Sequence, residues 1–297
     1  MLDLPPASRA PWWLRIAVKL VLARLPVPYR WWRRLGVFRH GCLDTDVEQR
    51  GKWFMLHSTN YRDIAPAPLR TVVELGPGDS VATALFARGF GAKRVWLVDV
   101  GRFATDDPVH YRAALARIAA LGGAPPAVPE PGGIDAVVAA TDAAYLSDGI
   151  ASLAAIADSS VDLIFSNAVL EHIRRDEFDR FLRESFRILR PGGVGSHLVD
   201  LGDHLGGGLN NLRFSRRMWE HPAMAGSGFY TNRLRHAEIC RRTAACGFRV
   251  TVTELARWPR PPTPRRKLAA EFRGLSDDEL AVAVFTVVMQ KPAAAPA

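Results

Sequence analysis

Residues 71–86, TVVELGPGDSVATALF, most narrowly restrict what this chain can fold into. An apolar run ends in an acid, and Gly-Pro-Gly, a short polar segment and a helical pattern follow. Glycines in such a turn permit a tight bend and let a ligand approach backbone atoms that a Cβ would block. Ligands of doubly wound sheets bind beyond the carboxyl ends of the strands. The stretch therefore predicts a strand, a ligand-binding turn and a helix in succession.

The same alternation continues to the end of the chain. Short β-branched runs alternate with helical ones, which predicts a mostly parallel sheet with helices on both faces. The predicted strands are 71–75, 94–100, 161–167, 194–201, 248–255 and 281–290, and the predicted helices are 80–90, 109–121, 176–189 and 232–246.

Three motifs together resemble the class I S-adenosylmethionine (SAM) dependent methyltransferases. They are VVELGPGDS at 72–80, VWLVDV at 95–100, and the segment that begins SSVDLIFSNAVLEHI at 159 and ends in RILRPGGV at 194. The resemblance implies an α/β fold, with a Rossmann-like seven-stranded, mostly parallel sheet whose seventh strand inserts antiparallel. It also implies SAM as the cofactor.

The resemblance assigns cofactor roles residue by residue. The motif-I residues would line the methionine part of SAM, Asp99 would bind the ribose hydroxyls and Val100 would lie against adenine. The full set it implies is Glu74, Gly76, Pro77, Gly78, Asp99, Val100, Gly149, Ile150, Asn167 and Ala168. The sequence departs from the family pattern at Ile150, where many members carry an acid, and Asp148 is a substitute for it. Ser80 stands where many members have a third glycine.

Candidate catalytic residues follow the fourth and fifth strands. The sequence SNAV after the fourth strand lacks the Asn/Asp-Pro-Pro-aromatic box of amino-methylating enzymes that act on bases, which favours another acceptor. An oxygen acceptor needs a base, and histidine titrates in the required range. We expect His204, oriented by Asp203, to be that base, with His172 as the alternative. The spacing of the histidine and acidic residues in this segment matches no metal-binding motif, so no metal site is predicted.

The first 65 residues form a predicted helical cap, the methyltransferase domain spans 66–292, and a disordered tail covers 293–297. The cap is basic and rich in tryptophan, and two short helices separated near Pro26 and a third helix over 47–57 are expected in it. Packing on the domain and contact with a membrane surface both explain this composition. Three cysteines in no metal-binding pattern and the lack of a signal peptide indicate a cytoplasmic protein, with a membrane-peripheral location as the alternative.

The formal charge of +9 is compatible with an anionic acceptor, and Arg213, Arg216, Arg233 and Arg235 are candidates to hold one. The predicted function is methyl transfer from SAM to a small-molecule or glycan-precursor acceptor, at oxygen. The alternatives are an RNA methyltransferase, although nucleic acid is the less favoured partner, and a non-catalytic SAM-binding protein. A nicotinamide-dependent dehydrogenase is disfavoured, because GPGDSV lacks the third glycine of the dinucleotide motif.

Overall fold

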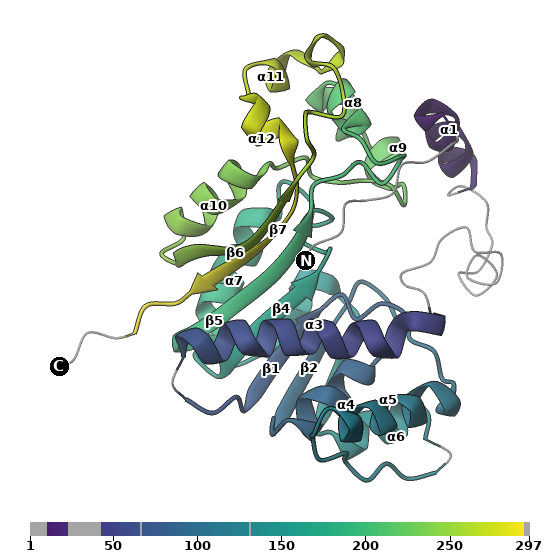
Figure 1. The fold of residues 1–297 in the computed structure, drawn as a ribbon, viewed down its shortest axis with the longest axis vertical. Helices are drawn as coiled ribbons and strands as arrows, with labels where there is room; N and C mark the ends of the chain where they lie inside the picture. The colour runs from purple at the N-terminus through teal and green to yellow at the C-terminus, as the bar shows by residue number, and fades with distance from the viewer. Residues whose placement is uncertain (1–10, 23–42, 66, 131, 294–297) are drawn as a thin grey trace.

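The computed structural model describes residues 11–22, 43–65, 67–130 and 132–293. A single seven-stranded sheet runs through the molecule (Figure 1). Its strands are β1 (Thr71–Leu75), β2 (Arg94–Val98), β3 (Ala143–Leu146), β4 (Val161–Asn167), β5 (Leu189–Asp200), β6 (Arg249–Arg257) and β7 (Val282–Gln290). Among the residues described, no helix is long and apolar enough to cross a bilayer.

The strand order is β3-β2-β1-β4-β5-β7-β6. The first five strands in this order are parallel, and β7 is antiparallel to both of its neighbours. The order reverses between β1 and β4, which places a ligand crevice at the carboxyl ends of these strands. The predicted fold, including the antiparallel seventh strand, is confirmed.

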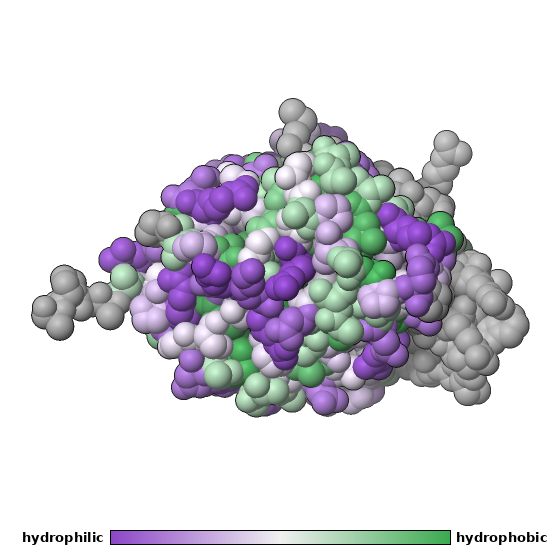
Figure 2. Space-filling view, turned by 90° about the horizontal axis from the view of Figure 1, so that it is seen from below, coloured by the Kyte–Doolittle hydropathy of each residue, from purple (hydrophilic) through white to green (hydrophobic). Residues whose placement is uncertain are grey.

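Helices cover both faces of the sheet (Figure 1). One face carries α3 (Leu43–Ile64), α4 (Ala82–Gly89), α5 (Pro108–Ala120) and α6 (Ile134–Ala140), and the other carries α7 (Phe178–Ile188), α10 (His236–Ala245) and the 3-10 helix Gly149–Ala155. Shorter helices lie beyond the carboxyl edge of β5: 3-10 helix Asn210–Arg213, α8 (Arg216–Trp219), α9 (Pro222–Ala225), 3-10 helix Arg265–Lys267, α11 (Ala270–Arg273) and α12 (Asp277–Ala281). Seen from below, the surface mixes hydrophilic and hydrophobic residues (Figure 2).

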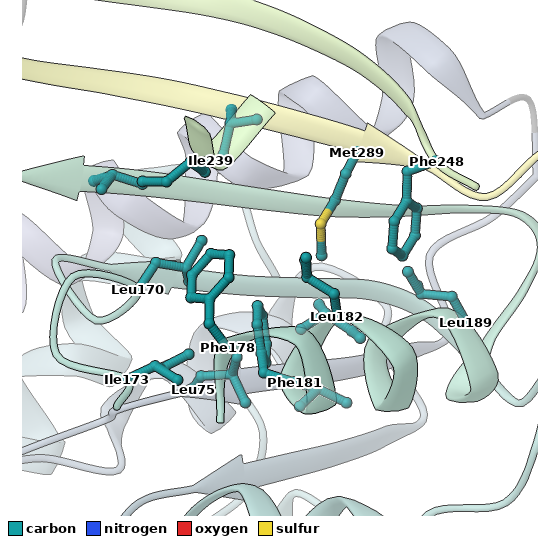
Figure 3. Close-up of a cluster of buried hydrophobic side chains, with 14 of the residues drawn as sticks. Leu75, Leu170, Ile173, Phe178, Phe181, Leu182, Leu189, Ile239, Phe248 and Met289 are labelled. Carbon is teal, nitrogen blue, oxygen red and sulfur yellow. The ribbon is translucent and has the colours of Figure 1, made fainter. Parts of the chain in front are cut away.

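The alternation of side chains along the strands divides the core in two. In β1, Val72 packs with the α3–α5 side, whereas Val73 and Leu75 pack with the α7–α10 side. Helix α7 supplies the second cluster with Phe178, Phe181 and Leu182, as the spacing in the sequence predicts (Figure 3). The side chain of Glu74 consequently points toward α3 and α4.

Helix α3 is part of the core that covers the sheet. It is longer than the predicted helix at 47–57, and Figure 1 shows it lying across the strands. Its Phe54 and Tyr61 are buried with Val72 and Phe165. The boundary predicted at residue 65 therefore falls within one hydrophobic core. The second of the two short helices, predicted after Pro26, and residues 294–297 of the predicted tail lie outside the described residues.

Two further elements differ from the prediction. Helix α6 occupies 134–140 and was not among the predicted helices, because it is short and directly follows a segment rich in glycine and proline at 122–133. Strand β5 starts at Leu189 and includes the RPGG sequence, because Val161 pairs with Leu189 before a bulge restores the register at Leu163 and Val194.

Candidate active site

The motif-I turn bends through two glycines in the left-handed region. Gly76 has φ +68° and Gly78 has φ +61°, a conformation that side chains with a Cβ rarely adopt. A Cβ on Gly76 would lie 2.5 Å from Cγ2 of Val169. The turn after β1 is thus in direct contact with the segment after β4, and both lie at the carboxyl edge.

A buried arginine from α3 supports this turn. The Arg50 guanidinium donates to the Pro77 carbonyl over 2.7 Å, and its Nη1 lies 3.7 Å from Oε1 of Glu74. Thr83 on α4 donates to the same carboxylate oxygen over 3.2 Å. Arg50 was not predicted as a site residue. The sequence gives one indication of its role: a helix places Arg50 on the same face as the apolar residues Val47 and Phe54, which pack in the core.

Asp99 links the second strand to motif I. Its Oδ2 accepts from the Gly78 N–H over 2.9 Å, and its Oδ1 accepts from the Val100 N–H over 2.7 Å. The Val100 side chain is 76% exposed, although it is apolar. Gly149, with φ +56°, lies next to it, since a Cβ there would be 3.2 Å from Val100 Cγ1. The predicted ribose and adenine residues are therefore neighbours, except that Ile150 packs against the core.

The side chain of Asn167 is held from α3. Its Oδ1 accepts from Nε2 of His57 over 3.0 Å, and the other ring nitrogen of His57 bonds the Ser196 hydroxyl over 2.8 Å. Burial lowers the pKa of His57 to about 4, so this imidazole is neutral near pH 7. Ala168 follows with φ +52°, and its N–H donates to the Leu198 carbonyl. His57 was not predicted, because periodicity does not show which strand a helix residue will contact.

Two histidines meet between the loops after β4 and β5. The ring centroids of His172 and His204 are 5.0 Å apart. Nδ1 of His172 bonds the Tyr230 carbonyl over 2.8 Å, which makes this nitrogen the donor. Nε2 of His204 lies 4.0 Å from Oε1 of Glu171 and 3.9 Å from Oδ2 of Asp200.

The carboxylates of this cluster are strongly perturbed. Glu171 is 2% exposed, and burial, reinforced by the charge of Asp200, raises its pKa well above the usual value. Burial also raises the pKa of Asp200. The pKa of His204 is lowered by burial first and then by the charge of Lys19 on α1 (Trp12–Leu22). The cluster is therefore a partly desolvated group of acids and imidazoles at the carboxyl edge.

Asp203 does not orient His204 by a hydrogen bond, as was predicted, but binds the backbone of its own loop. Its fully buried carboxylate accepts bonds from the backbone N–H groups of the loop that follows it, and no hydrogen bond to His204 occurs in the described chain. The donors are the N–H groups of Leu205, Gly206, Gly208 and Asn210 and the side-chain amide of Asn210. These bonds prevail over the burial that opposes them and lower the pKa of Asp203. Asp203 shapes the loop, and Glu171 and Asp200 are the carboxylates nearest the His204 ring.

Two of the candidate arginines serve the fold. Arg235 is buried and donates to the carbonyls of Leu201 and Val282, and Arg233 donates to the Phe214 carbonyl. They were predicted as anion-binding candidates because sequence spacing cannot distinguish a buried cation from a surface one. A small pocket does open beside the cluster, and its lining consists of Glu171, Asp200, Leu201, Gly202, Asn211, Leu212, Thr231, Asn232, Arg233, Leu234 and Arg235.

A family model matches part of the chain. A family described as methyltransferase domain matches residues 134–196, which run from α6 into β5. No curated protein matches this sequence.

Several solved structures are similar at low identity. One is a chain of the complex between the Haloferax volcanii Trm112 methyltransferase activator and a methyltransferase. It is 18% identical, and the alignment covers 84% of this chain and 93% of that chain with a TM-score of 0.44. Another is a SAM-dependent methyltransferase from Methanosarcina mazei, at 16% identity, 76% of this chain, 94% of that chain and TM-score 0.43. A third is Haemonchus contortus phosphoethanolamine N-methyltransferase 2 in complex with SAM, at 16% identity, 80% of this chain, 52% of that chain and TM-score 0.42.

Proposed function

We propose that this protein, a class I SAM-dependent methyltransferase by its strand order and its family match, methylates an oxygen atom of a small molecule or glycan precursor. The observation that favours an oxygen acceptor is the pair His172 and His204, whose ring centroids are 5.0 Å apart at the carboxyl edge of the sheet. The segment that bears His172 begins at Val169, which touches the motif-I turn. The imidazoles thus lie on the side of the sheet where the SAM methyl group is expected.

Methyl transfer from SAM is a displacement at a carbon that the sulfonium already activates. Catalysis then consists mainly of holding the nucleophile in line with the methyl group. A hydroxyl acceptor must also lose its proton. His204 can take that proton itself, or the cluster can lower the hydroxyl pKa by binding a cation. In either case the two histidines activate the acceptor, and Asp203 keeps His204 in place by shaping its loop.

The test is single-turnover transfer of labelled methyl from SAM to fractionated metabolites. We expect His204→Ala and His172→Ala to slow transfer by about 10²–10⁴-fold, the usual effect of losing an acid–base group. S-adenosylhomocysteine affinity should remain unchanged in both variants. His221→Ala, an exposed histidine on the loop before α9, is the matched control. Wild-type rates in both variants, or transfer to RNA alone, would contradict the proposal.

Helix α1 suggests where the acceptor is met. Its Ile16 is buried and Trp12 packs edge-on against Phe214. Its other side exposes Trp13, Leu14, Val18 and Val21, by 58%, 42%, 46% and 62%. At 100° per residue these four side chains fall within one sector of the helix. Apolar and aromatic side chains beside Arg15 and Lys19 suit the boundary of an anionic lipid surface.

Because Lys19 lies close enough to His204 to lower its pKa, a membrane bound by α1 would adjoin the candidate site. We therefore include peripheral membrane contact in the proposed function. The measurement is co-sedimentation with vesicles of phosphatidylglycerol and phosphatidylcholine. Trp13→Glu with Val18→Glu should weaken binding at least tenfold, whereas Val109→Glu on α5, 62% exposed, should not. Equal binding by all three proteins would refute the role of α1.

A further inference from the structure

We infer that Glu171, His172 and His204 form a binding site for a divalent first-row transition metal ion. One potential ligand atom from each residue lies within 4.8 Å of the other two. The residues come from two loops, after β4 and after β5, which the parallel sheet brings to one edge. The role of the ion rests on the proposed function, whereas its binding stands on the geometry alone.

Two buried polar atoms in this cluster have no hydrogen-bond partner among the described residues. They are Oε2 of Glu171 and Nε2 of His204. Leaving a buried polar atom without a partner costs about 1–3 kcal/mol, and more when the group is charged. Glu171 is 2% exposed, so water does not readily replace the partner. A cation between the two side chains would satisfy both atoms at once.

The surroundings hold the imidazoles as metal ligands are commonly held. Nδ1 of His172 donates to the Tyr230 carbonyl, which leaves the lone pair on Nε2. Such a second bond fixes the tautomer and the ring direction of metal-binding histidines. His204 has φ +50°, an uncommon conformation for a residue with a side chain, and the bonds to Asp203 maintain it. Strain that the surroundings maintain in this way is characteristic of functional positions.

The charge balance also favours a cation. Glu171 and Asp200 lie side by side, since the Asp200 N–H donates to Oε1 of Glu171 over 3.2 Å, and both carboxylates come within 4.0 Å of Nε2 of His204. Arg235, which lines the adjoining pocket, donates to the backbone carbonyls of Leu201 and Val282. A divalent ion would offset both carboxylates, and Asp200, whose Oδ2 is 3.9 Å from His204 Nε2, is within reach as a further ligand.

The donor set selects the type of metal. Two imidazoles and one carboxylate suit Zn²⁺, Mn²⁺, Fe²⁺ or Co²⁺, whereas Mg²⁺ and Ca²⁺ prefer oxygen donors alone. Ligand bonds of about 2.0–2.2 Å require the donors to approach one another from their present separations. Three protein ligands leave a position for the acceptor.

At that position the ion would lower the pKa of the acceptor hydroxyl, as it does for bound water. The hydroxyl proton passes to solvent, the oxygen bonds the methyl carbon, the carbon–sulfur bond breaks and its electron pair remains on sulfur. S-adenosylhomocysteine then leaves with an uncharged thioether sulfur, and the positive charge of the sulfonium is balanced by the proton released, so no further reactant is needed.

The test uses the full-length protein freed of metal by a chelator. Calorimetric titration with Zn²⁺ should give one site, and Co²⁺ should give a visible spectrum without the intense thiolate band that binding by Cys240 would add. His204→Ala and Glu171→Gln should each weaken Zn²⁺ binding at least 100-fold. His221→Ala is the control and should bind as the wild type does. S-adenosylhomocysteine affinity confirms that each variant is folded.

Glu171→Gln also allows a thermal-melting test that does not depend on methyl transfer. Glutamine keeps the side-chain shape and an acceptor for the Asp200 N–H, so the metal-free variant should melt close to the metal-free wild type. Added Zn²⁺ should raise the melting temperature of the wild type only. Zn²⁺ binding that is absent, or equal in wild type and variants, would overturn the inference. Methyl transfer that continues without metal would leave the proposed function standing, whereas metal binding without any transfer would count against that function alone.

Discussion

Arg50 shows how a single buried charge connects a helix to a ligand turn. Its side chain and that of Glu74 are only 3% and 4% exposed. Removing one member of a buried ion pair leaves the other charge uncompensated, which costs about 3–5 kcal/mol. Sequence patterns cannot reveal this pair. Arg50 lies on α3 and Glu74 on β1, and the pattern of neither element shows that the two pack together.

We expect Arg50→Met to lower the free energy of unfolding by about 3–5 kcal/mol and to weaken S-adenosylhomocysteine binding, since the Pro77 carbonyl loses its donor. Denaturation in urea followed by tryptophan fluorescence measures the first effect, and calorimetry the second. Arg62→Met, an exposed position on the same helix, is the control. A loss below about 1 kcal/mol would show that the pair is dispensable.

Asp99 carries the second residue-level prediction. Its carboxylate accepts the N–H groups of Gly78 and Val100, and these bonds hold it at the turn where the family resemblance places the ribose hydroxyls. A hydrogen bond to a charged group contributes about 1.5–3 kcal/mol, so Asp99→Ala should weaken S-adenosylhomocysteine binding roughly tenfold or more.

Gly78→Val should weaken S-adenosylhomocysteine binding as well, because valine is strained at φ +61°. Asp63→Asn on α3 serves as the control for both variants. Wild-type affinity in both folded variants would remove the cofactor assignment.

Helix α10 and the segment before β7 are joined by an ionisable pair. The Cys240 thiol and the Glu279 carboxylate raise the pKa of His236 to about 9. Nδ1 of His236 lies 3.6 Å from Oε2 of Glu279. Since the folded pKa lies above the ordinary 6.5, the stabilisation is complete below pH 6.5 and is lost as the pH rises through about 9.

We therefore expect wild type to be more stable than His236→Gln at pH 6, and this difference to shrink toward zero by pH 9.5. The measurement is urea denaturation of both proteins at several pH values. A difference that stays constant with pH would contradict the role assigned to the His236 charge.

The elements with strong periodicity were predictable, and those defined by tertiary contact were not. The sequence predicts β1, α4, β4 and α7 because each has a continuous apolar face of its own. Helix α6 and strand β3 are short and partly exposed, so their patterns are weak. In the site, the motifs predict Asp99 and Gly78, whereas Arg50 and His57 make contacts more than twenty residues away in sequence, which no motif shows.

At the scale of the whole molecule, the free energy of local opening should differ from one element to another. Strand β7 is almost wholly buried and has a partner strand on each side, whereas α1 buries only Ile16. Local opening requires little free energy where few apolar contacts form. Hydrogen exchange followed by mass spectrometry should thus show the slowest amides in β5 and β7 and fast exchange in α1. Slow exchange in α1 would indicate that its packing against the α8–α9 region is as firm as the sheet.

The antiparallel insertion of β7 also affects the order in which the protein can be assembled on the ribosome. Strand β6 emerges first, yet within the described residues its only partner strand is β7, and 24 residues separate the two. Until β7 arrives, β5 presents an open strand edge and β6 has no neighbour, an arrangement prone to wrong pairing. Distant pairings of this kind form slowly. A ribosome pause between residues 257 and 282 would therefore prolong the interval in which the nascent chain needs a chaperone.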